Sequence, residues 1–129
     1  MGFLKNFSSS QNTDLNKDWK TLDSLTQLEQ IIDDSHQKPV AIFKHSTRCG
    51  ISTMAKSQLE DGWNISSDDL DFYYLDLLAH RPISNEIADQ LDVMHQSPQV
   101  ILIKNGKAVF SNTHHSISAD ALQNALAKV

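Results

Sequence analysis

The order in which helical and extended patterns follow one another restricts the fold of this chain more than any other feature. From Ser24 onward, apolar residues recur at spacings of three and four, which is typical of a helix with one buried face. Short apolar stretches then alternate with further helical patterns, and each stretch is typical of a strand. The expected strands cover residues 40–44, 72–75, 99–104 and 107–110. Asn105-Gly106, between the last two strands, predicts a tight hairpin.

Local signals also predict where the helices begin and end. Lys38-Pro39 is expected to end the first helix, because proline cannot continue one. Ser84 is expected to cap the third helix and Ser118 the last, since a serine hydroxyl can accept a hydrogen bond from a first-turn amide.

The arrangement of these elements predicts the fold class. Strands that alternate with helices favour parallel neighbours, whereas a hairpin joins antiparallel ones. The chain is therefore expected to be α/β, with a four- or five-stranded mixed sheet flanked by helices, the arrangement of the thioredoxin fold. Residues 18–129 are expected to form this one domain, with Trp19 and Trp63 as packing residues. Residues 1–17 are polar and are expected to form an N-terminal extension.

Composition and charge argue against several classes of partner. The formal net charge is −5, unlike the basic surface that binds nucleic-acid phosphates. The longest apolar runs, residues 40–43 and 100–103, are far shorter than the roughly 20 residues of a membrane-spanning helix. With a single cysteine the chain cannot form an intramolecular disulfide, and its first residues lack the apolar stretch of a signal peptide. These features predict a cytoplasmic protein without nucleic-acid or membrane partners.

Cys49 carries the clearest chemical signal in the sequence. It follows an expected buried strand and stands at the first turn of the next helix, where unpaired amides and the helix dipole favour a thiolate. Arg48 adds a neighbouring cation, and the Ser52 hydroxyl, one turn further, can reach back to the sulfur. The alternative is a small core residue, as many free cysteines are. Polar neighbours, and a place outside the expected buried face of this helix, favour a nucleophile. That face is expected to consist of Ile51, Ala55 and Leu59.

Two segments resemble one family of redox proteins. Residues 43–52, Phe-Lys-His-Ser-Thr-Arg-Cys-Gly-Ile-Ser, resemble the active-site loop of the monothiol bacilliredoxins, the YtxJ-like proteins of the bacillithiol system. Residues 95–100, His-Gln-Ser-Pro-Gln-Val, are similar to the segment ahead of the third strand in the same family. The resemblance covers nearly all of the expected folded part. It departs at Gly50, where the family usually has proline after the nucleophilic cysteine.

The resemblance implies disulfide exchange with a low-molecular-weight thiol, with bacillithiol as co-substrate and bacillithiolated proteins as partners. Ser52 stands where a dithiol enzyme has its second cysteine, so no internal disulfide can release the substrate. Cys49 would therefore attack a mixed disulfide, take over the small thiol and be reset by an external thiol. The implied activity is that of a monothiol thiol–disulfide oxidoreductase with no bound cofactor.

The resemblance also implies a binding site around Cys49. Pro98 is expected to be cis and to face the nucleophile, as the corresponding proline does in thioredoxin folds. Ser97 would then supply a backbone edge that can pair with an extended substrate. The other expected thiol- and substrate-binding residues are Arg48, Gly50 and His45.

Two alternatives come from other functional classes. Cys-Gly-Ile-Ser is similar to the Cys-Gly-Phe-Ser motif of monothiol glutaredoxins, many of which hold an iron–sulfur cluster between two subunits with glutathione. After residues 98–100, however, this chain lacks the Gly-Gly and acidic pair that usually anchor glutathione. The other alternative is a thioredoxin-fold interaction module in which Cys49 is inert.

The histidines carry weaker signals than the cysteine. His45, His95, His114 and His115 have no regular metal-ligand spacing, so no metal site is expected. The adjacent pair His114-His115 is expected in a solvated loop after the hairpin. His45 and His95 could tune Cys49 or meet an anionic thiol, although a lone histidine is more often structural.

Overall fold

The computed structural model describes residues 19–129, and the expected extension of residues 1–17 lies outside this range. The described part contains strands, α-helices and a short 3-10 helix, η2. In chain order these are β1 (Trp19–Thr21), α2 (Leu25–Asp34), β2 (Val40–His45), α3 (Gly50–Glu60), β3 (Asp71–Asp76), α4 (Arg81–Leu91), β4 (Gln99–Lys104), β5 (Lys107–Thr113), η2 (His114–Ser116) and α5 (Ala119–Ala127). None of these helices has the length and apolar character needed to cross a membrane.

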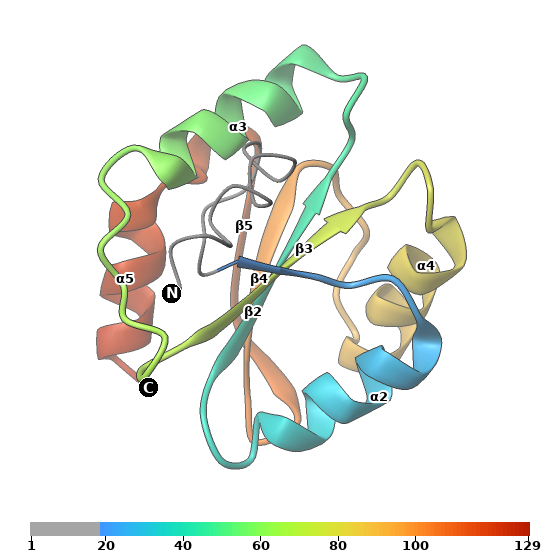
Figure 1. Ribbon diagram of the computed structural model, residues 1–129, viewed down its shortest axis with the longest axis vertical. Coiled ribbons are helices and arrows are strands. Elements are labelled where there is room, and N and C mark those ends of the chain that lie inside the picture. Colours follow the sequence, from blue (N-terminus) through green and yellow to red (C-terminus); the bar gives the residue numbers. More distant parts are fainter. Residues whose placement is uncertain (1–18) are drawn as a thin grey trace, which may run out of the picture.

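The strands form one mixed, five-stranded sheet in the order β1-β3-β2-β4-β5 (Figure 1). β3 pairs in parallel with both β1 and β2, whereas β4 is antiparallel to both β2 and β5. The β4–β5 hairpin turns at Asn105 and Gly106, whose φ angles are 56° and 78°. Asn-Gly is favoured in such turns because both positions need positive φ. The mixed sheet and its hairpin confirm the expected architecture.

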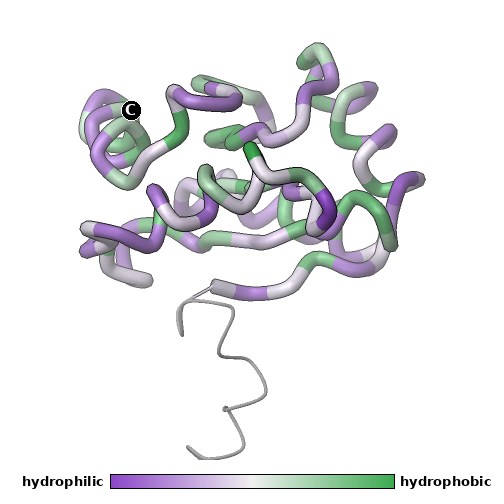
Figure 2. The backbone as a smooth tube through the Cα atoms, turned by 90° about the horizontal axis from the view of Figure 1, so that it is seen from above, coloured by the Kyte–Doolittle hydropathy of each residue, from purple (hydrophilic) through white to green (hydrophobic). Residues whose placement is uncertain are grey.

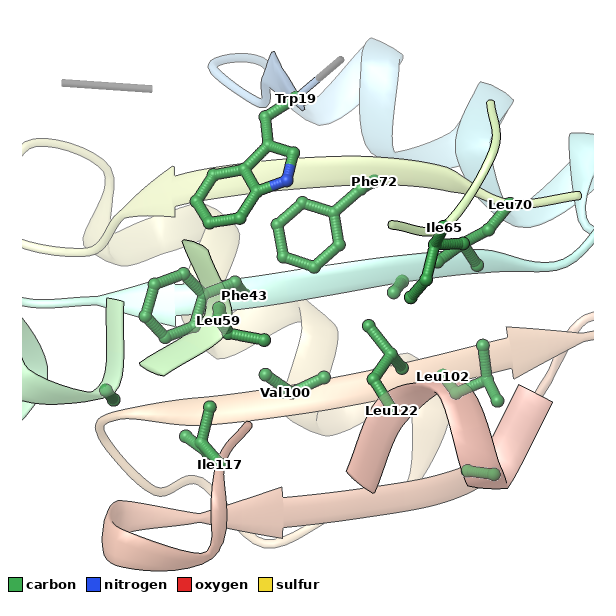
Figure 3. Packing of buried hydrophobic residues seen from close by; sticks show 13 residues of the cluster. Trp19, Phe43, Leu59, Ile65, Leu70, Phe72, Val100, Leu102, Ile117 and Leu122 are labelled. Carbon is green, nitrogen blue, oxygen red and sulfur yellow. The ribbon is translucent and has the colours of Figure 1, made fainter. Parts of the chain in front are cut away.

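Helices cover both faces of the sheet. α3 and α5 pack together over one face, and α2 and α4 pack together over the other. Because both faces are buried, successive residues of the apolar central strands enter opposite cores. Phe43 and Leu102 lie in the core that Figure 3 shows, whereas Ile42 and Ile101 lie in the core on the opposite face. Hydrophobic and hydrophilic stretches follow one another along the helices in Figure 2. The buried residues of α2, α4 and α5 recur at helical spacings, so one side of each helix is buried.

The fifth strand, β1, has no counterpart among the expected strands. It is three residues long and lies at the edge of the sheet beside β3. Its position is secured by Trp19, which is only 5% exposed. The Trp19 ring lies 4.5 Å from that of Phe72 and 5.3 Å from that of Trp63, measured between ring centroids. Both tryptophans are therefore packing residues, as predicted.

The start of α4 corrects one expectation, because Ser84 does not cap this helix. The N-cap is His80, and Pro82 lies in the first turn. Proline is favoured there, since its fixed φ suits a helix start and its missing N–H is not needed. The helix therefore begins before Ser84, which is buried inside it. Ser118 does cap α5: its hydroxyl accepts a hydrogen bond from the Ala121 amide at 3.0 Å.

The end of α2 corrects a second expectation. The helix ends at Asp34, before the expected stop at Pro39. The reason lies in the β4–β5 hairpin, which bonds to the residue after the helix. The Ser35 carbonyl accepts a hydrogen bond from the Asn105 amide at 2.9 Å, and the Ser35 hydroxyl accepts one from Gly106 at 2.8 Å. A tertiary contact thus determines where this helix stops.

The buried face of α3 differs from the expected one in its first residue. Ser52, Ala55 and Leu59 are buried, whereas Ile51 is 40% exposed. Ser52 lies three residues before Ala55 and Ile51 lies four residues before it. Both spacings place a residue on the same helix face as Ala55 and Leu59. Periodicity alone therefore could not choose between Ile51 and Ser52.

Candidate active site

Cys49 lies where the chain passes from β2 into α3, at one end of the sheet (Figure 1). The connecting turn closes with a hydrogen bond from the Cys49 amide to the Ser46 carbonyl at 3.1 Å. Cys49 is the N-cap of α3, with extended backbone (φ −106°) and no side-chain capping hydrogen bond. Its side chain is partly exposed. An N-cap residue faces the unpaired amides of the first turn, so the thiol has hydrogen-bond donors next to it.

The first turn of α3 lowers the pKa of the Cys49 thiol below its ordinary value of 9.0. The largest cause is the Ser52 backbone amide, followed by the Ile51 amide, and the Ser52 hydroxyl adds a smaller effect in the same direction. These donors stabilise the thiolate more than the thiol. Partial desolvation opposes them. The predicted depression is confirmed, but Arg48, expected to help as a cation, is not among its causes.

Ser52 has a second contact that the sequence did not indicate. Its side chain is fully buried, and its hydroxyl accepts a hydrogen bond from the Ser46 amide at 3.2 Å. Ser52 therefore ties the loop before Cys49 to the first turn of α3. An internal disulfide cannot form, because the chain has one cysteine and a serine stands at this position.

His45 lies beneath this loop and not on the surface beside the thiol. It is 4% exposed, and its ring centroid lies 5.4 Å from that of Phe43 and 5.3 Å from that of Tyr74. Burial, the largest cause, and the charge of Lys56 lower the pKa of His45, while the charge of Asp76 and then the Ser52 backbone oppose them. Its Nδ1 atom has no hydrogen-bond partner among residues 19–129. A substrate approaching Cys49 would therefore not meet this ring directly.

Arg48 and Gly50 flank Cys49, and both are exposed. Gly50 is the first residue of α3. Apart from its two chain neighbours and the α3 backbone, no atom of residues 19–129 lies within 4 Å of a Cβ atom placed at this position. The position therefore has room for a side chain, and proline is generally favoured at the start of a helix.

Ser97 and Pro98 lie at the same end of the sheet as Cys49. The Ser97–Pro98 peptide bond is cis, as expected. Pro98 directly precedes Gln99, which pairs with Lys44 near the end of β2. Ser97 is partly exposed, whereas Pro98 is buried. The fold thus places Ser97 and Pro98 at the same end of the sheet as Cys49, although the two segments are far apart in the chain.

A buried lysine near the site has no counterpart in the sequence-based expectations. Lys44 is fully buried. Its ammonium donates to the Ser84 carbonyl at 3.3 Å and lies 3.2 Å from Nδ1 of His95. Burial, reinforced by the charge of Arg81, lowers the pKa of Lys44 to about 8. The signal in the sequence was a single charged residue at the end of an otherwise apolar strand.

Gln99 was also missed, although it belongs to one of the segments that carry the family resemblance. Its side chain is 2% exposed. The amide oxygen accepts a hydrogen bond from the Gln96 backbone at 3.3 Å, and the amide nitrogen donates to the Met94 carbonyl at 3.1 Å. Gln99 therefore holds together the loop that leads to Pro98.

The described histidines form no metal centre. Within residues 19–129, no group of three or more His, Cys, Asp or Glu side chains is arranged to hold a metal ion. His114 and His115 begin the 3-10 helix η2, where the sequence predicted a loop. The positive φ of His114, 52°, marks the sharp change of direction after β5.

Comparison with known proteins agrees with this geometry. The family model described as monothiol bacilliredoxin BrxC matches residues 20–122. A solved structure described as a proposed oxidoreductase with a thioredoxin fold is 34% identical, with a TM-score of 0.73, over 84% of this chain and 94% of that one. The thioredoxin of Malassezia sympodialis is 21% identical, with a TM-score of 0.66, over 84% of this chain and 88% of that one. A thioredoxin variant from Halobacterium salinarum is 17% identical, with a TM-score of 0.63, over 86% and 89%. The last two likenesses concern the fold alone.

Proposed function

The chain belongs to the monothiol bacilliredoxin family, and from this premise we propose that it removes bacillithiol from protein mixed disulfides. It is a thiol–disulfide oxidoreductase with the thioredoxin fold. Bacillithiol is in this proposal a co-substrate and not a resident cofactor, and the partners are proteins that carry it on a cysteine. The setting is the reducing cytoplasm of a bacterium that makes bacillithiol.

The proposed reaction has two exchange steps. The Cys49 thiolate attacks the bacillithiol sulfur of the mixed disulfide, forming a Cys49–bacillithiol disulfide and releasing the protein thiolate. The substrate protein is thereby reduced, and Cys49 carries the oxidised sulfur. A second thiol from solution then attacks the bacillithiol sulfur of the adduct and restores the Cys49 thiolate. Electrons thus come from the external thiol, and no internal disulfide is needed.

The observation that carries this proposal is the environment of Cys49. The thiol is partly exposed, and first-turn amides of α3 lower its pKa, so the nucleophilic form is populated closer to neutral pH. Ser52 occupies the position of a resolving cysteine. A reactive thiol without a partner thiol in its own chain fits exchange with small external thiols.

We assign the residues around Cys49 at this end of the sheet to binding in the same proposal. Ser97 would pair through its backbone with the extended segment that carries the modified cysteine, and Pro98 would bound this edge. Arg48 would attract the anionic groups of the small thiol, because its guanidinium is always charged. Gly50 would leave space for the adduct, since no atom of the described residues beyond its chain neighbours and the α3 backbone lies within 4 Å of a Cβ placed there.

The test is intact-mass measurement after the reduced protein is mixed with bacillithiol disulfide and, separately, with glutathione disulfide. Cys49→Ser is the control, and we expect it to form no adduct. The parent protein should gain one bacillithiol rapidly and gain glutathione slowly or not at all. Turnover on a bacillithiolated protein would then follow the release of its free thiol.

The other outcomes point to the two alternatives. Preference for glutathione would overturn the assignment to bacillithiol and lead to a test for an iron–sulfur cluster, by visible absorbance after anaerobic purification. Absence of an adduct with either disulfide would contradict a reactive Cys49 and leave an interaction module.

A further inference from the structure

Lys44 is a charged side chain that the proposed reaction does not use. It is fully buried, yet no carboxylate of residues 19–129 lies within ion-pair distance of it. Its hydrogen-bond partners are neutral groups, the Ser84 carbonyl in α4 and Nδ1 of His95. A buried ammonium without a counter-ion is costly, so its hydrogen bonds carry much of the compensation.

The contact with His95 is informative about the proton on that ring. An ammonium can only donate, so Nδ1 of His95 must accept when Lys44 is charged. His95 is then neutral, with its proton on Nε2. The Ser84 hydroxyl lies 3.3 Å from the same Nδ1 atom and can also donate to it. Both neighbours therefore favour the neutral imidazole.

This contact bridges two distant parts of the chain at the active end of the sheet. Lys44 precedes the last residue of β2, shortly before Cys49, whereas His95 belongs to the loop that leads to Ser97 and Pro98. Within this loop, Gln99 binds the backbone on both sides of His95. Moving His95 would therefore move the backbone of the segment that presents Ser97.

We infer that the hydrogen bond between Lys44 and His95 positions the loop of residues 94–98 for substrate binding, and that a proton on His95 releases this loop. When both groups are protonated, two N–H donors face each other and two positive charges lie about 3 Å apart. The hydrogen bond is lost and the charges repel. Lys44 and His95 are thus positioning residues, and their effect on turnover rests on the proposed function.

The direction of the pH dependence follows from the groups around His95. The charged groups that act on its ring are Lys44 from β2 and Arg81 from α4, and both are cationic. Burial, the largest cause, and these two charges lower the pKa of His95 below its ordinary value of 6.5. The folded protein therefore favours neutral His95. The loop is held at neutral pH and is released as the pH falls through the lowered pKa of His95, which lies below 6.5.

The first test needs no substrate and follows the reduced protein by nuclear magnetic resonance. We expect the Nε2–H tautomer of His95, and a titration midpoint below 6.5 that also appears in the amide signals of residues 94–99. Lys44→Met retains the length of the side chain and removes its charge, so the His95 midpoint should shift upward. His36→Asn, which replaces an exposed histidine, is the matched control and should leave the midpoint unchanged.

Two results would overturn the inference at this stage. One is a His95 titration without shifts in residues 94–99, and the other is an unchanged midpoint in folded Lys44→Met. Circular dichroism establishes whether that variant folds. If it does not, His95→Asn provides the test, because its amide oxygen can still accept but does not titrate. The shifts of residues 94–99 should then vanish, and their persistence would contradict the inference.

The second test measures KM for a bacillithiolated peptide between pH 7.5 and pH 5.5. We expect KM to rise toward low pH in the parent protein and in His36→Asn, but not in His95→Asn. An equal rise in all of them would contradict the role of the loop in substrate binding. Failure of the proposed function is distinguishable from failure of this inference. In that case the protein would show no turnover at any pH, while the nuclear magnetic resonance results would remain as expected.

Discussion

At the scale of single residues, the proposed chemistry rests on Cys49 and Ser52. Cys49 supplies the sulfur, and the first-turn amides of α3 lower its pKa. Ser52 contributes twice, through its amide and hydroxyl near the sulfur and through the hydrogen bond that its hydroxyl accepts from Ser46. A position that in a dithiol enzyme completes the redox pair here supports the proposed nucleophile and the loop before it.

Replacing Ser52 with alanine should therefore change the pKa of the Cys49 thiol without abolishing its reactivity. The thiol pKa should rise, because one donor is lost, but remain below 9.0, because the amides of residues 51 and 52 still donate. Reactivity at neutral pH should fall accordingly, since less thiolate is present. The Ser46 amide loses its acceptor, which should lower the free energy of unfolding by about 1–3 kcal/mol. The rate of iodoacetamide alkylation as a function of pH measures the first effect, and urea unfolding measures the second.

The matched control for this variant is Ser57→Ala, an exposed position in the same helix. It should leave both the alkylation profile and the unfolding curve unchanged. An alkylation profile of Ser52→Ala identical to that of the parent protein would show that the hydroxyl does not act on the sulfur.

At the scale of elements, the loop between α4 and β4 is held by side chains and not by regular structure. Gln99 bonds to the backbone of Gln96 and Met94 from inside, and His95 contacts Lys44 and Ser84. These contacts fix the conformation of a segment that carries no helix or strand of its own. The substrate-facing edge proposed at Ser97 therefore depends on buried polar side chains.

Gln99→Leu tests this dependence. Leucine preserves the approximate volume but leaves a backbone carbonyl and a backbone amide without their partner, so we expect a loss of about 1–3 kcal/mol in unfolding free energy. Amide hydrogen exchange of residues 94–98 should quicken more than that of β2, because the opening is local. Gln90→Leu, a change at an exposed site in α4, should do neither. Equal exchange in the loops of both variants would contradict the role of Gln99.

At the scale of the whole molecule, the two cores on either face of the sheet support the end of the sheet where Cys49 and Ser97 lie. The sheet places the end of β2 and the start of β4 side by side, because these strands are antiparallel. Cys49 and Ser97 follow and precede these strand ends, so the site gathers where the strands stop. The aromatic packing of Trp19 lies at the edge strand β1 and stabilises the sheet on which this geometry rests.

Trp19→Ala should therefore reduce stability. We expect a loss of about 3–5 kcal/mol in unfolding free energy, the usual range for removing a buried tryptophan. Val109→Ala, at a strand position that is 45% exposed, should change it by less than about 0.5 kcal/mol. Urea unfolding followed by circular dichroism gives both values. A loss no larger than that of the control would show that β1 does not contribute to the core.

The sequence by itself determined the order of most elements, the hairpin and the place of Cys49 at the start of a helix that lowers its thiol pKa. Each of these depends on residues close together in the chain: apolar periodicity, an Asn-Gly turn, and a thiol at the start of a helix. The cis bond before Pro98 was also predicted, but through the expected fold and not from its neighbours. Local signals sufficed wherever the physical cause was local.

Only the tertiary structure decided the remaining features, because their partners are far apart in the chain. β1 exists through pairing with β3, and α2 stops where the β4–β5 hairpin bonds to Ser35. The choice between Ile51 and Ser52 as the buried residue was made by packing against the sheet. Lys44 and His95 are separated by 51 positions, and no local pattern links a strand lysine to a loop histidine. Such contacts form when the sheet is assembled, since hydrogen bonds are stronger in the buried interior than in an isolated segment in water.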